Sequence, residues 1–198
     1  MAGFNPTETL RLFLAISIPE TVREELRRFQ VELQPLLPTR VVRWARADQF
    51  HLTLKFLGNV AARDVPALTE AARVICAGSP PMYLQAQGVG FFPNDYSPRV
   101  FWVDIKSGDG LLQKLQQQLQ SAVERFAEKQ AAKKFAAHIT LARFERLARR
   151  DSEKFAARAL TDKVFGEWKA QEVELIQSRL QPSGAIHAIL DTFKTKSD

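Results

Sequence analysis

Cysteine, histidine and long hydrophobic runs are scarce in this sequence. Its single cysteine, Cys76, cannot form a disulfide within the chain and falls in an apolar stretch typical of a buried thiol. Apolar runs such as residues 12–18 are too short to cross a bilayer. The residues before this run, which include Glu8, lack the basic start and small-residue cleavage site of a secretion signal. We therefore expect a cytoplasmic protein without membrane association.

The overall composition is that of an ordinary globular protein with an excess of positive charge. Of the 198 residues, 45% are hydrophobic and 25% are charged, and 28 Lys and Arg against 22 Asp and Glu leave a formal net charge of +6. Positive charge favours polyanionic ligands such as nucleic acid, although many basic domains bind none. No low-complexity linker interrupts the chain, so we expect residues 1–198 to form a single domain and the protein to be a monomer.

The order of apolar patterns predicts alternating strands and helices arranged as an internal duplication. A strand around Phe13 leads through a helix to His51, 38 residues later, and a strand around Phe101 leads through a helix to His138, 37 residues later. The pattern predicts an α+β fold of two similar lobes, each a mostly antiparallel sheet backed by helices, with a central cleft. The expected strands are residues 10–17, 41–44, 51–57, 82–89, 99–106, 138–144, 171–180 and 185–193, and the expected helices are 19–34, 62–77, 110–130 and 147–160.

Two of the three histidines begin nearly identical tetrapeptides, HLTL at residues 51–54 and HITL at 138–141. Because strand side chains alternate between faces, the histidine and threonine of each motif share one face while the intervening apolar residues face the core. Two such strands facing across a groove place two imidazoles and two hydroxyls around one point. A lone His-x-Thr is a weak signal, but its recurrence in two matched contexts indicates a functional pair rather than two core histidines.

This constellation is suited to cleaving a phosphodiester. Hydrolysis of a cyclic phosphate needs a base that activates water and an acid that protonates the departing sugar oxygen, on opposite sides of phosphorus. Histidine serves in both roles because its unperturbed pKa is about 6.5. The hydroxyls of Thr53 and Thr140 can donate hydrogen bonds to the non-bridging oxygens. The three histidines and one cysteine show no clustered ligand spacing, so no metal or other cofactor is predicted.

The paired motifs at 51–54 and 138–141 resemble the HxTx motifs of the 2H phosphoesterase superfamily. Within it, the chain is most similar to the RNA 2′,3′-cyclic phosphodiesterases of bacteria and archaea, also called 2′-5′ RNA ligases. The resemblance implies metal-independent hydrolysis of a terminal 2′,3′-cyclic phosphate of RNA to a 2′-phosphomonoester, and leaves open whether the reverse 2′-5′ ligation also occurs. It runs nearly end to end and includes LRLFLAISIPE, RWARADQFHLTLKFLG, PRVFWVDI, HITLARF and SRLQPSGAIHAIL.

The resemblance also implies roles for individual residues. His51 would donate a proton and His138 would accept one, although the sequence itself does not separate these roles. Arg143 matches the substrate-contacting arginine of the family's HxTxxR pattern. Its odd offset from His138 puts it on the opposite face of an ideal strand, so a bulge or the strand end must redirect it. His187 stands where the family often has tyrosine, and a structural role is favoured for it.

The sequence leaves the ligand and any base-stacking surface open. The same site fits 2′-5′-linked oligonucleotides or cyclic phosphates of small nucleotides, and a non-catalytic nucleotide- or RNA-binding module would keep the same cleft. Two complete motifs favour an enzyme, because binding alone does not require both imidazoles. Base stacking is a candidate role for five aromatic residues: Trp44, Phe91, Phe92, Tyr96 and Trp102.

Overall fold

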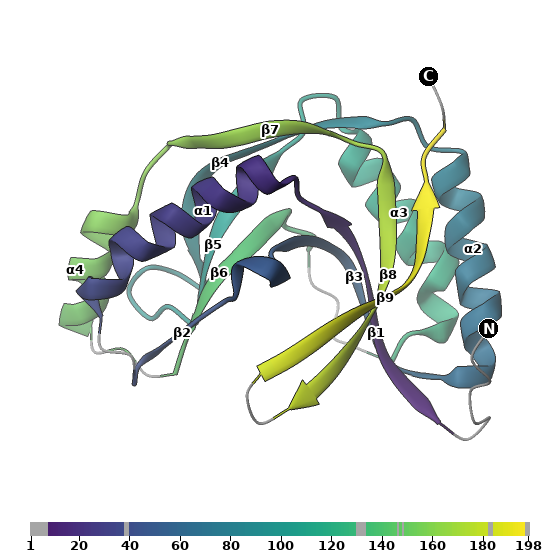
Figure 1. Ribbon diagram of the computed structural model, residues 1–198, viewed down its shortest axis with the longest axis horizontal. Coiled ribbons are helices and arrows are strands. Elements are labelled where there is room, and N and C mark those ends of the chain that lie inside the picture. The colour runs from purple at the N-terminus through teal and green to yellow at the C-terminus, as the bar shows by residue number, and fades with distance from the viewer. Residues whose placement is uncertain are drawn as a thin grey trace.

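Two antiparallel sheets form the framework of the protein in the computed structural model, which describes residues 8–37, 40–129, 134–145, 147, 149–181 and 184–196. The strands are β1 (Thr9–Ser17), β2 (Val42–Trp44), β3 (His51–Ala61), β4 (Met82–Phe92), β5 (Val100–Lys106), β6 (His138–Phe144), β7 (Val164–Ala170), β8 (Glu172–Gln181) and β9 (Gly184–Lys194). The four-stranded sheet has the order β3-β1-β8-β9 and the five-stranded sheet the order β2-β6-β5-β4-β7 (Figure 1). The predicted α+β architecture with mostly antiparallel sheets is confirmed.

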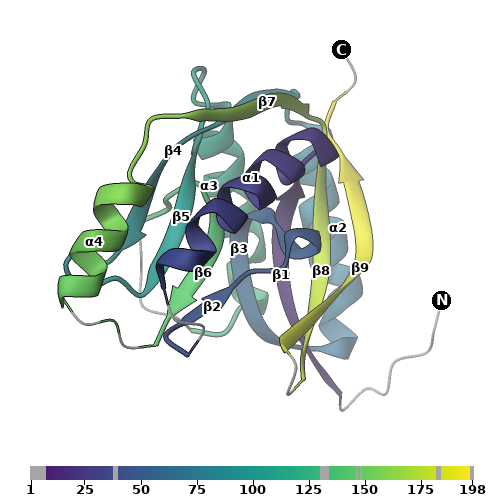
Figure 2. The same cartoon turned by 60° about the vertical axis from the view of Figure 1, so that its left-hand side comes forward.

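Four α-helices in the described residues cover the sheets: α1 (Glu20–Leu33), α2 (Val65–Ala77), α3 (Leu111–Val123) and α4 (Arg149–Ala159). Helices α2 and α3 pack together on the four-stranded sheet, and α1 and α4 lie on the five-stranded sheet (Figures 1 and 2). Each helix buries an apolar stripe, which stabilises helices of this length more than intrinsic propensity does. No helix among the described residues is long and apolar enough to span a membrane.

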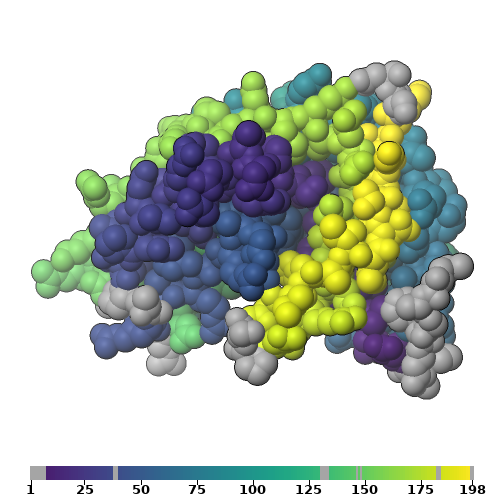
Figure 3. Space-filling model, in the orientation of Figure 1, coloured from purple at the N-terminus to yellow at the C-terminus, as the bar shows by residue number. Residues whose placement is uncertain are grey.

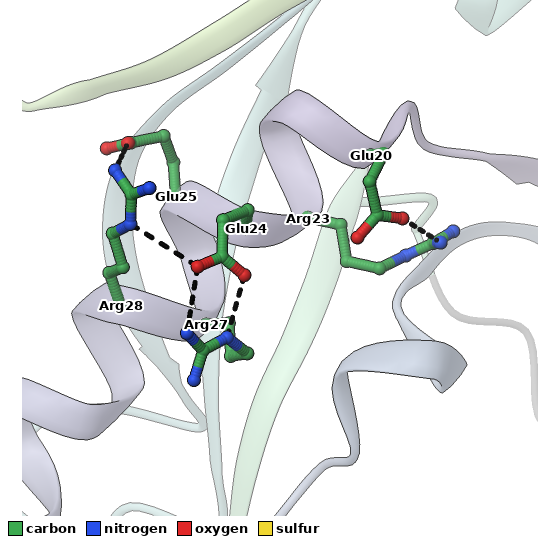
Figure 4. Close-up of polar contacts among 6 residues, drawn as sticks. All are labelled: Glu20, Arg23, Glu24, Glu25, Arg27 and Arg28. Atoms are coloured by element: carbon green, nitrogen blue, oxygen red, sulfur yellow. Dashed lines mark hydrogen bonds and ion pairs between the residues drawn. The ribbon is translucent and has the colours of Figure 1, made fainter.

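The exposed face of α1 carries a ladder of ion pairs (Figure 4). Glu20 pairs with Arg23, and the Glu24 carboxylate lies 2.7 Å from Arg27 and 3.4 Å from Arg28. The hydrogen bond from Arg27 is the main cause that lowers the pKa of Glu24 to about 2. Because solvent screens exposed pairs, this ladder marks the outer face of α1 and adds little stability. The opposite, apolar face of α1 is what attaches the helix to the five-stranded sheet.

At two places along the chain, a strand of one sheet is followed by a helix that packs on the other sheet. Strand β1 belongs to the four-stranded sheet, yet the following helix α1 lies on the other sheet, where the ring centroids of Phe29 and Phe165 are 5.0 Å apart. Strand β5 belongs to the five-stranded sheet, yet the following helix α3 lies on the four-stranded one, where the Gln116 amide donates to the Leu54 carbonyl. One continuous apolar core joins both lobes. We therefore propose that residues 1–198 form one cooperative domain.

Strand β3 continues through Gly58, where the sequence pattern predicted its end. The strand runs on to Ala61, because Gly58 adopts a φ of 73° where the pairing with β1 changes register. The prediction was wrong because a glycine at a bulge bends a strand without ending it. The carboxylate of Glu128 lies against the position that a Cβ of residue 58 would occupy. This strand extension forms part of the wall of the cavity described below.

Two further elements differ from the predictions. The helix predicted over residues 110–130 ends at Val123 and is followed by a 3₁₀ turn, Glu124–Phe126. Strand β7 was not predicted at all. Its pattern is interrupted by Gly166, where a Cβ would meet the side chain of Val22 in α1. A glycine is needed where α1 packs closely against β7, so the sequence there lacks the regular alternation by which a strand is predicted.

Replacing Gly58 with alanine is expected to lower the free energy of unfolding by about 1–2 kcal/mol, because the positive φ and the Glu128 carboxylate both oppose a Cβ. Urea unfolding followed by circular dichroism should show a single transition with a lower midpoint. Gly108→Ala is the matched control, since no atom lies within 4 Å of its Cβ position. An unchanged midpoint for Gly58→Ala would contradict this account of the bulge.

Candidate active site

Strands β3 and β6 present the two histidine motifs to one cavity. His51 and His138 are the first residues of their strands, and Thr53 and Thr140 follow two positions later on the same faces. All four side chains line a cavity of about 600 Å³. The apolar residues between them are buried, so ideal alternation holds over both tetrapeptides. Among the described residues, no group of three or more His, Cys, Asp or Glu gathers as a metal site would require.

Each imidazole is oriented by a backbone carbonyl two residues earlier in the chain. Nδ1 of His51 lies 2.7 Å from the carbonyl oxygen of Gln49, and Nδ1 of His138 lies 2.7 Å from that of Ala136. Because a carbonyl oxygen only accepts, Nδ1 carries the hydrogen in both rings. The neutral rings therefore keep Nε2 unprotonated on the edge that faces away from the backbone. The two lobes thus prepare the same tautomer for proton transfer in the cavity.

Both imidazoles are neutral near pH 7 in the unliganded protein. Burial lowers the pKa of His51 to about 4, although the carbonyl of Gln49 opposes the shift. Repulsion from the neighbouring His187 and His138 rings, when these are protonated, lowers the pKa of His51 further. Burial also lowers the pKa of His138, and the guanidinium of Arg143 adds to that effect. The second ring is therefore held in the form that accepts a proton.

A β-bulge in β6 turns Arg143 toward the cavity. The pairing with β5 skips Leu141, so that Thr140 and Ala142 oppose consecutive residues of β5. Leu141 and Ala142 are consequently both buried, and Arg143 returns to the face that carries His138, where it lines the cavity. The bulge therefore provides the change of face that the odd offset of Arg143 from His138 requires. Within the described residues the Arg143 guanidinium makes no hydrogen bond or ion pair, so it is free to bind an anion.

Phe56 occupies in β3 the position that Arg143 occupies in β6. The pairing of β3 with β1 skips Leu54, which reproduces the bulge of the other lobe. Phe56 follows His51 by five residues, as Arg143 follows His138, and it lines the cavity with 49% of its surface exposed. One lobe therefore contributes a phenyl ring, suited to a base, and the other a guanidinium, suited to a phosphate. The equal offset is the signal in the sequence that would have identified Phe56.

Aromatic rings surround both histidines, and two of them, Phe92 and Trp102, are among the five residues proposed from the sequence to stack on bases. The ring centroid of Phe13 lies 4.9 Å from that of His51, and those of Phe92 and Trp102 lie 5.0 and 6.2 Å from that of His138. None of the five aromatic residues proposed from the sequence lines the cavity. Phe92 and Trp102 support the His138 ring instead, and the aromatic rings in the cavity come from β1 and β3.

The end of the β8–β9 hairpin and the third histidine form one side of the cavity. His187 lines it, with its ring centroid 5.4 Å from that of His51 and 5.1 Å from that of Phe13. The side-chain amide of Gln49 donates to the carbonyl of Ala185, so the hairpin end lies against the segment before β3 (Figure 3). Gln49 therefore contacts the hairpin through its side chain and His51 through its carbonyl.

Comparison with known proteins supports one family. The family model described as LigT-like phosphoesterase matches residues 16–102. The RNA 2′,3′-cyclic phosphodiesterase of Thermus thermophilus is 30% identical over 196 residues, which cover 96% of this chain and 92% of the relative. The protein of the same name from Archaeoglobus fulgidus is 29% identical over 185 residues, which cover 93% of this chain and 100% of the relative.

Solved structures agree with these sequence relationships. The crystal structure of a Thermus thermophilus protein matches with a TM-score of 0.79 at 30% identity, and E. coli LigT complexed with 3′-AMP matches with a TM-score of 0.77 at 26% identity. Both comparisons cover 96% of this chain and 100% of the solved chain. The fold and the paired histidine strands thus define a LigT-like phosphoesterase. Because the identity to the Thermus relative extends over nearly the full length of both proteins, this chain belongs to the RNA 2′,3′-cyclic phosphodiesterase family.

Lowering the pH from 7 to 4.5 is expected to destabilise the wild-type protein more than a His51→Gln variant. An unfolded histidine has a pKa of about 6.5, whereas burial lowers the pKa of His51 in the folded protein to about 4. Between these values the unfolded state binds more protons, so stability falls as the pH falls. The contribution of His51 to this loss is about 2–3 kcal/mol at most. Urea unfolding of both proteins at the two pH values measures it, and equal losses would contradict a buried, neutral His51.

Proposed function

We propose that this protein hydrolyses the 2′,3′-cyclic phosphate at the 3′ end of RNA to a 2′-phosphomonoester, with His51 as the acid and His138 as the base. The observation that carries the proposal is that both imidazoles bind a carbonyl through Nδ1 and line one cavity with the opposite edge free. Two proton-transfer groups around a common point meet the requirement of in-line displacement at phosphorus. The named activity of the relatives supports the same bond as the target.

The reaction is a single in-line displacement. Nε2 of His138 removes a proton from water as the water oxygen attacks phosphorus on the side opposite O3′. The bond between phosphorus and O3′ breaks, and protonated His51 donates its Nε2 hydrogen to the departing O3′. The product carries a 2′-phosphate and a free 3′-hydroxyl, with His138 protonated and His51 neutral. Proton exchange with solvent then restores the starting forms of both rings.

The substrate supplies the negative charge that the acid needs. With a pKa of about 4, His51 is neutral in the unliganded protein at pH 7. A phosphodiester anion beside the ring favours the imidazolium form, so binding of the substrate takes up a proton there. Arg143 lowers the pKa of His138 and keeps that ring in its basic form. The base is assigned to His138 because the chain resembles a family in which the second motif histidine accepts the proton.

The remaining residues of the cavity bind the substrate. The hydroxyls of Thr53 and Thr140 donate to the non-bridging oxygens, where charge develops during attack. Neither hydroxyl is engaged by another group in the part of the chain that the structure describes. Arg143 binds the same phosphate through its planar pair of donors, and Phe56 packs on the terminal base. The cavity thus pairs a polar phosphate site with an aromatic base site.

We also propose that the enzyme works as a monomer in the cytoplasm. The motif strands, Arg143 and Phe56 come from one chain, which places a complete set of groups in the cavity without a partner. Cys76 is fully buried, and burial raises the pKa of its thiol to about 12. With this single buried thiol the chain has no internal disulfide, so its fold does not depend on an oxidising compartment.

Alanine at His51 or at His138 is expected to lower the rate of 2′,3′-cyclic AMP hydrolysis about 10²–10⁴-fold, because each change removes one proton-transfer group. Arg143→Ala should lower kcat/KM roughly 10–100-fold through loss of a charged hydrogen bond. Arg43→Ala is the matched control, since Arg43 opposes Arg143 in β2 but pairs with Glu145 at the surface. Full activity of either histidine variant, or a wild-type protein that binds the nucleotide without forming a 2′-phosphate product, would refute the proposal.

The rate is expected to depend on pH and not on added metal. One imidazole must be neutral and the other protonated in the complex with substrate, so kcat, which reports the groups of that complex, should follow a bell-shaped pH profile. Its acid limb reports protonation of the base, His138, and its basic limb reports deprotonation of the acid, His51. Activity should persist in excess EDTA. Loss of activity in the chelator that added metal restores would rule out the two-histidine mechanism.

A further inference from the structure

The cavity extends beyond the histidines along the pairing of β1 with β3. Thr53 pairs with Ala15, whereas Arg11 pairs with Asn59 further along the same two strands. Arg11 and Ala15 are four residues apart on β1, which corresponds to about 13 Å of strand. Arg11 also lines the cavity. The cavity wall therefore carries a positive charge well away from Thr53, which belongs to the proposed site of the cyclic phosphate.

The guanidinium of Arg11 has no partner among the described residues. Arg11 is exposed on the cavity face of β1 between the buried Leu10 and Leu12, and its side chain makes no hydrogen bond or ion pair there. On the surface of the five-stranded sheet, by contrast, Arg43 pairs with Glu145 at 3.0 Å. An arginine without a carboxylate partner that faces a cavity presents donors in the planar geometry that fits a phosphate.

An acidic side chain lies at the same end of the cavity and is engaged elsewhere. Glu128 lines the cavity beside Gly58, and its carboxylate accepts a hydrogen bond of 2.8 Å from the side-chain amide of Asn59. Its backbone N–H donates to the carbonyl of Leu57, which holds the residue over β3. Within the described residues, no ion pair joins Glu128 to Arg11. The positive charge of Arg11 is therefore left for a ligand.

We infer that Arg11 binds the phosphodiester that precedes the terminal nucleotide, so that the enzyme prefers an oligoribonucleotide to a cyclic mononucleotide. The inference rests on the proposed function, because it takes the cyclic phosphate to lie between His51 and His138. Phe56 pairs with Phe13 between the threonine and the arginine along β1 and β3, and so lies beside the terminal nucleoside. The RNA continues from that nucleoside through its 5′ oxygen to the next phosphate, toward Arg11.

The two arginines of the cavity act on different phosphates. Arg143 belongs to β6 in the five-stranded sheet, and its charge lowers the pKa of His138, so it acts where the bond is cleaved. Arg11 belongs to β1 in the four-stranded sheet and is not among the groups that shift the pKa of His51 or of His138. A mononucleotide therefore engages Arg143 alone, whereas a dinucleotide engages both guanidinium groups.

The test compares kcat/KM for 2′,3′-cyclic AMP with kcat/KM for the dinucleotide ApA that carries a terminal 2′,3′-cyclic phosphate. The wild-type enzyme is expected to prefer the dinucleotide, and this preference should weaken as salt is raised. Arg11→Gln should lower the dinucleotide-to-mononucleotide ratio about 10–100-fold, chiefly through KM, because one charged hydrogen bond is lost. Arg11→Lys, which keeps the charge, should recover part of the ratio. Arg43→Gln is the matched control and should keep the wild-type ratio, because Arg43 is an exposed arginine in β2 of the other sheet and pairs with Glu145.

The outcomes separate this inference from the proposed function. A wild-type enzyme without preference for the dinucleotide would overturn the role of Arg11 while leaving the hydrolysis intact. An Arg11→Gln variant that keeps the ratio, or that loses both activities equally, would overturn it in the same way. Hydrolysis of neither substrate by the wild-type enzyme would refute the proposed function itself. A ratio that falls in Arg11→Gln and recovers in Arg11→Lys supports the second phosphate site.

Discussion

Alternating burial along β3 and β6 is the constraint on which the site depends. Leu52 and Ile139, which follow the two histidines, are completely buried in the shared core. A register shift of one residue would move these side chains into the cavity and turn the imidazoles into the core. Each buried aliphatic side chain stabilises the observed register by about 2 kcal/mol. The apolar packing of the core therefore determines that the imidazoles of His51 and His138 face the cavity.

Features that depend on neighbours along the chain were predicted from the sequence, and features that depend on pairing across the sheets were not. The histidine and threonine faces follow from local alternation and were predicted. For Arg143 the odd offset from His138 required a bulge or the strand end, and the pairing of β6 with β5 supplies the bulge. The face of Phe56 depends on a second bulge, between β3 and β1, which was not predicted. Strand β7 escaped prediction because Gly166 packs against Val22, far away in the sequence. The exchange of helices between lobes is equally a matter of tertiary packing.

The cavity wall carries positive groups whose charge a phosphate ligand would balance. The chain has a net charge of +6, and Arg143 and Arg11 add positive charge at the cavity wall. Burial keeps both imidazoles neutral in the absence of a ligand, which avoids repulsion between adjacent cations. A bound phosphate reverses this balance at His51 and makes its protonation favourable. In the proposed mechanism, substrate binding and the formation of the acid are therefore one event.

Gln49 makes the position of the β8–β9 hairpin and the orientation of His51 interdependent. Its side chain is bound to Ala185 at the hairpin end, while its carbonyl selects the tautomer of the His51 ring. The hairpin therefore contacts the same residue that orients His51, the proposed proton donor. One glutamine thus fixes both a wall of the cavity and the orientation of the histidine inside it, so a substitution of Gln49 would alter the two together.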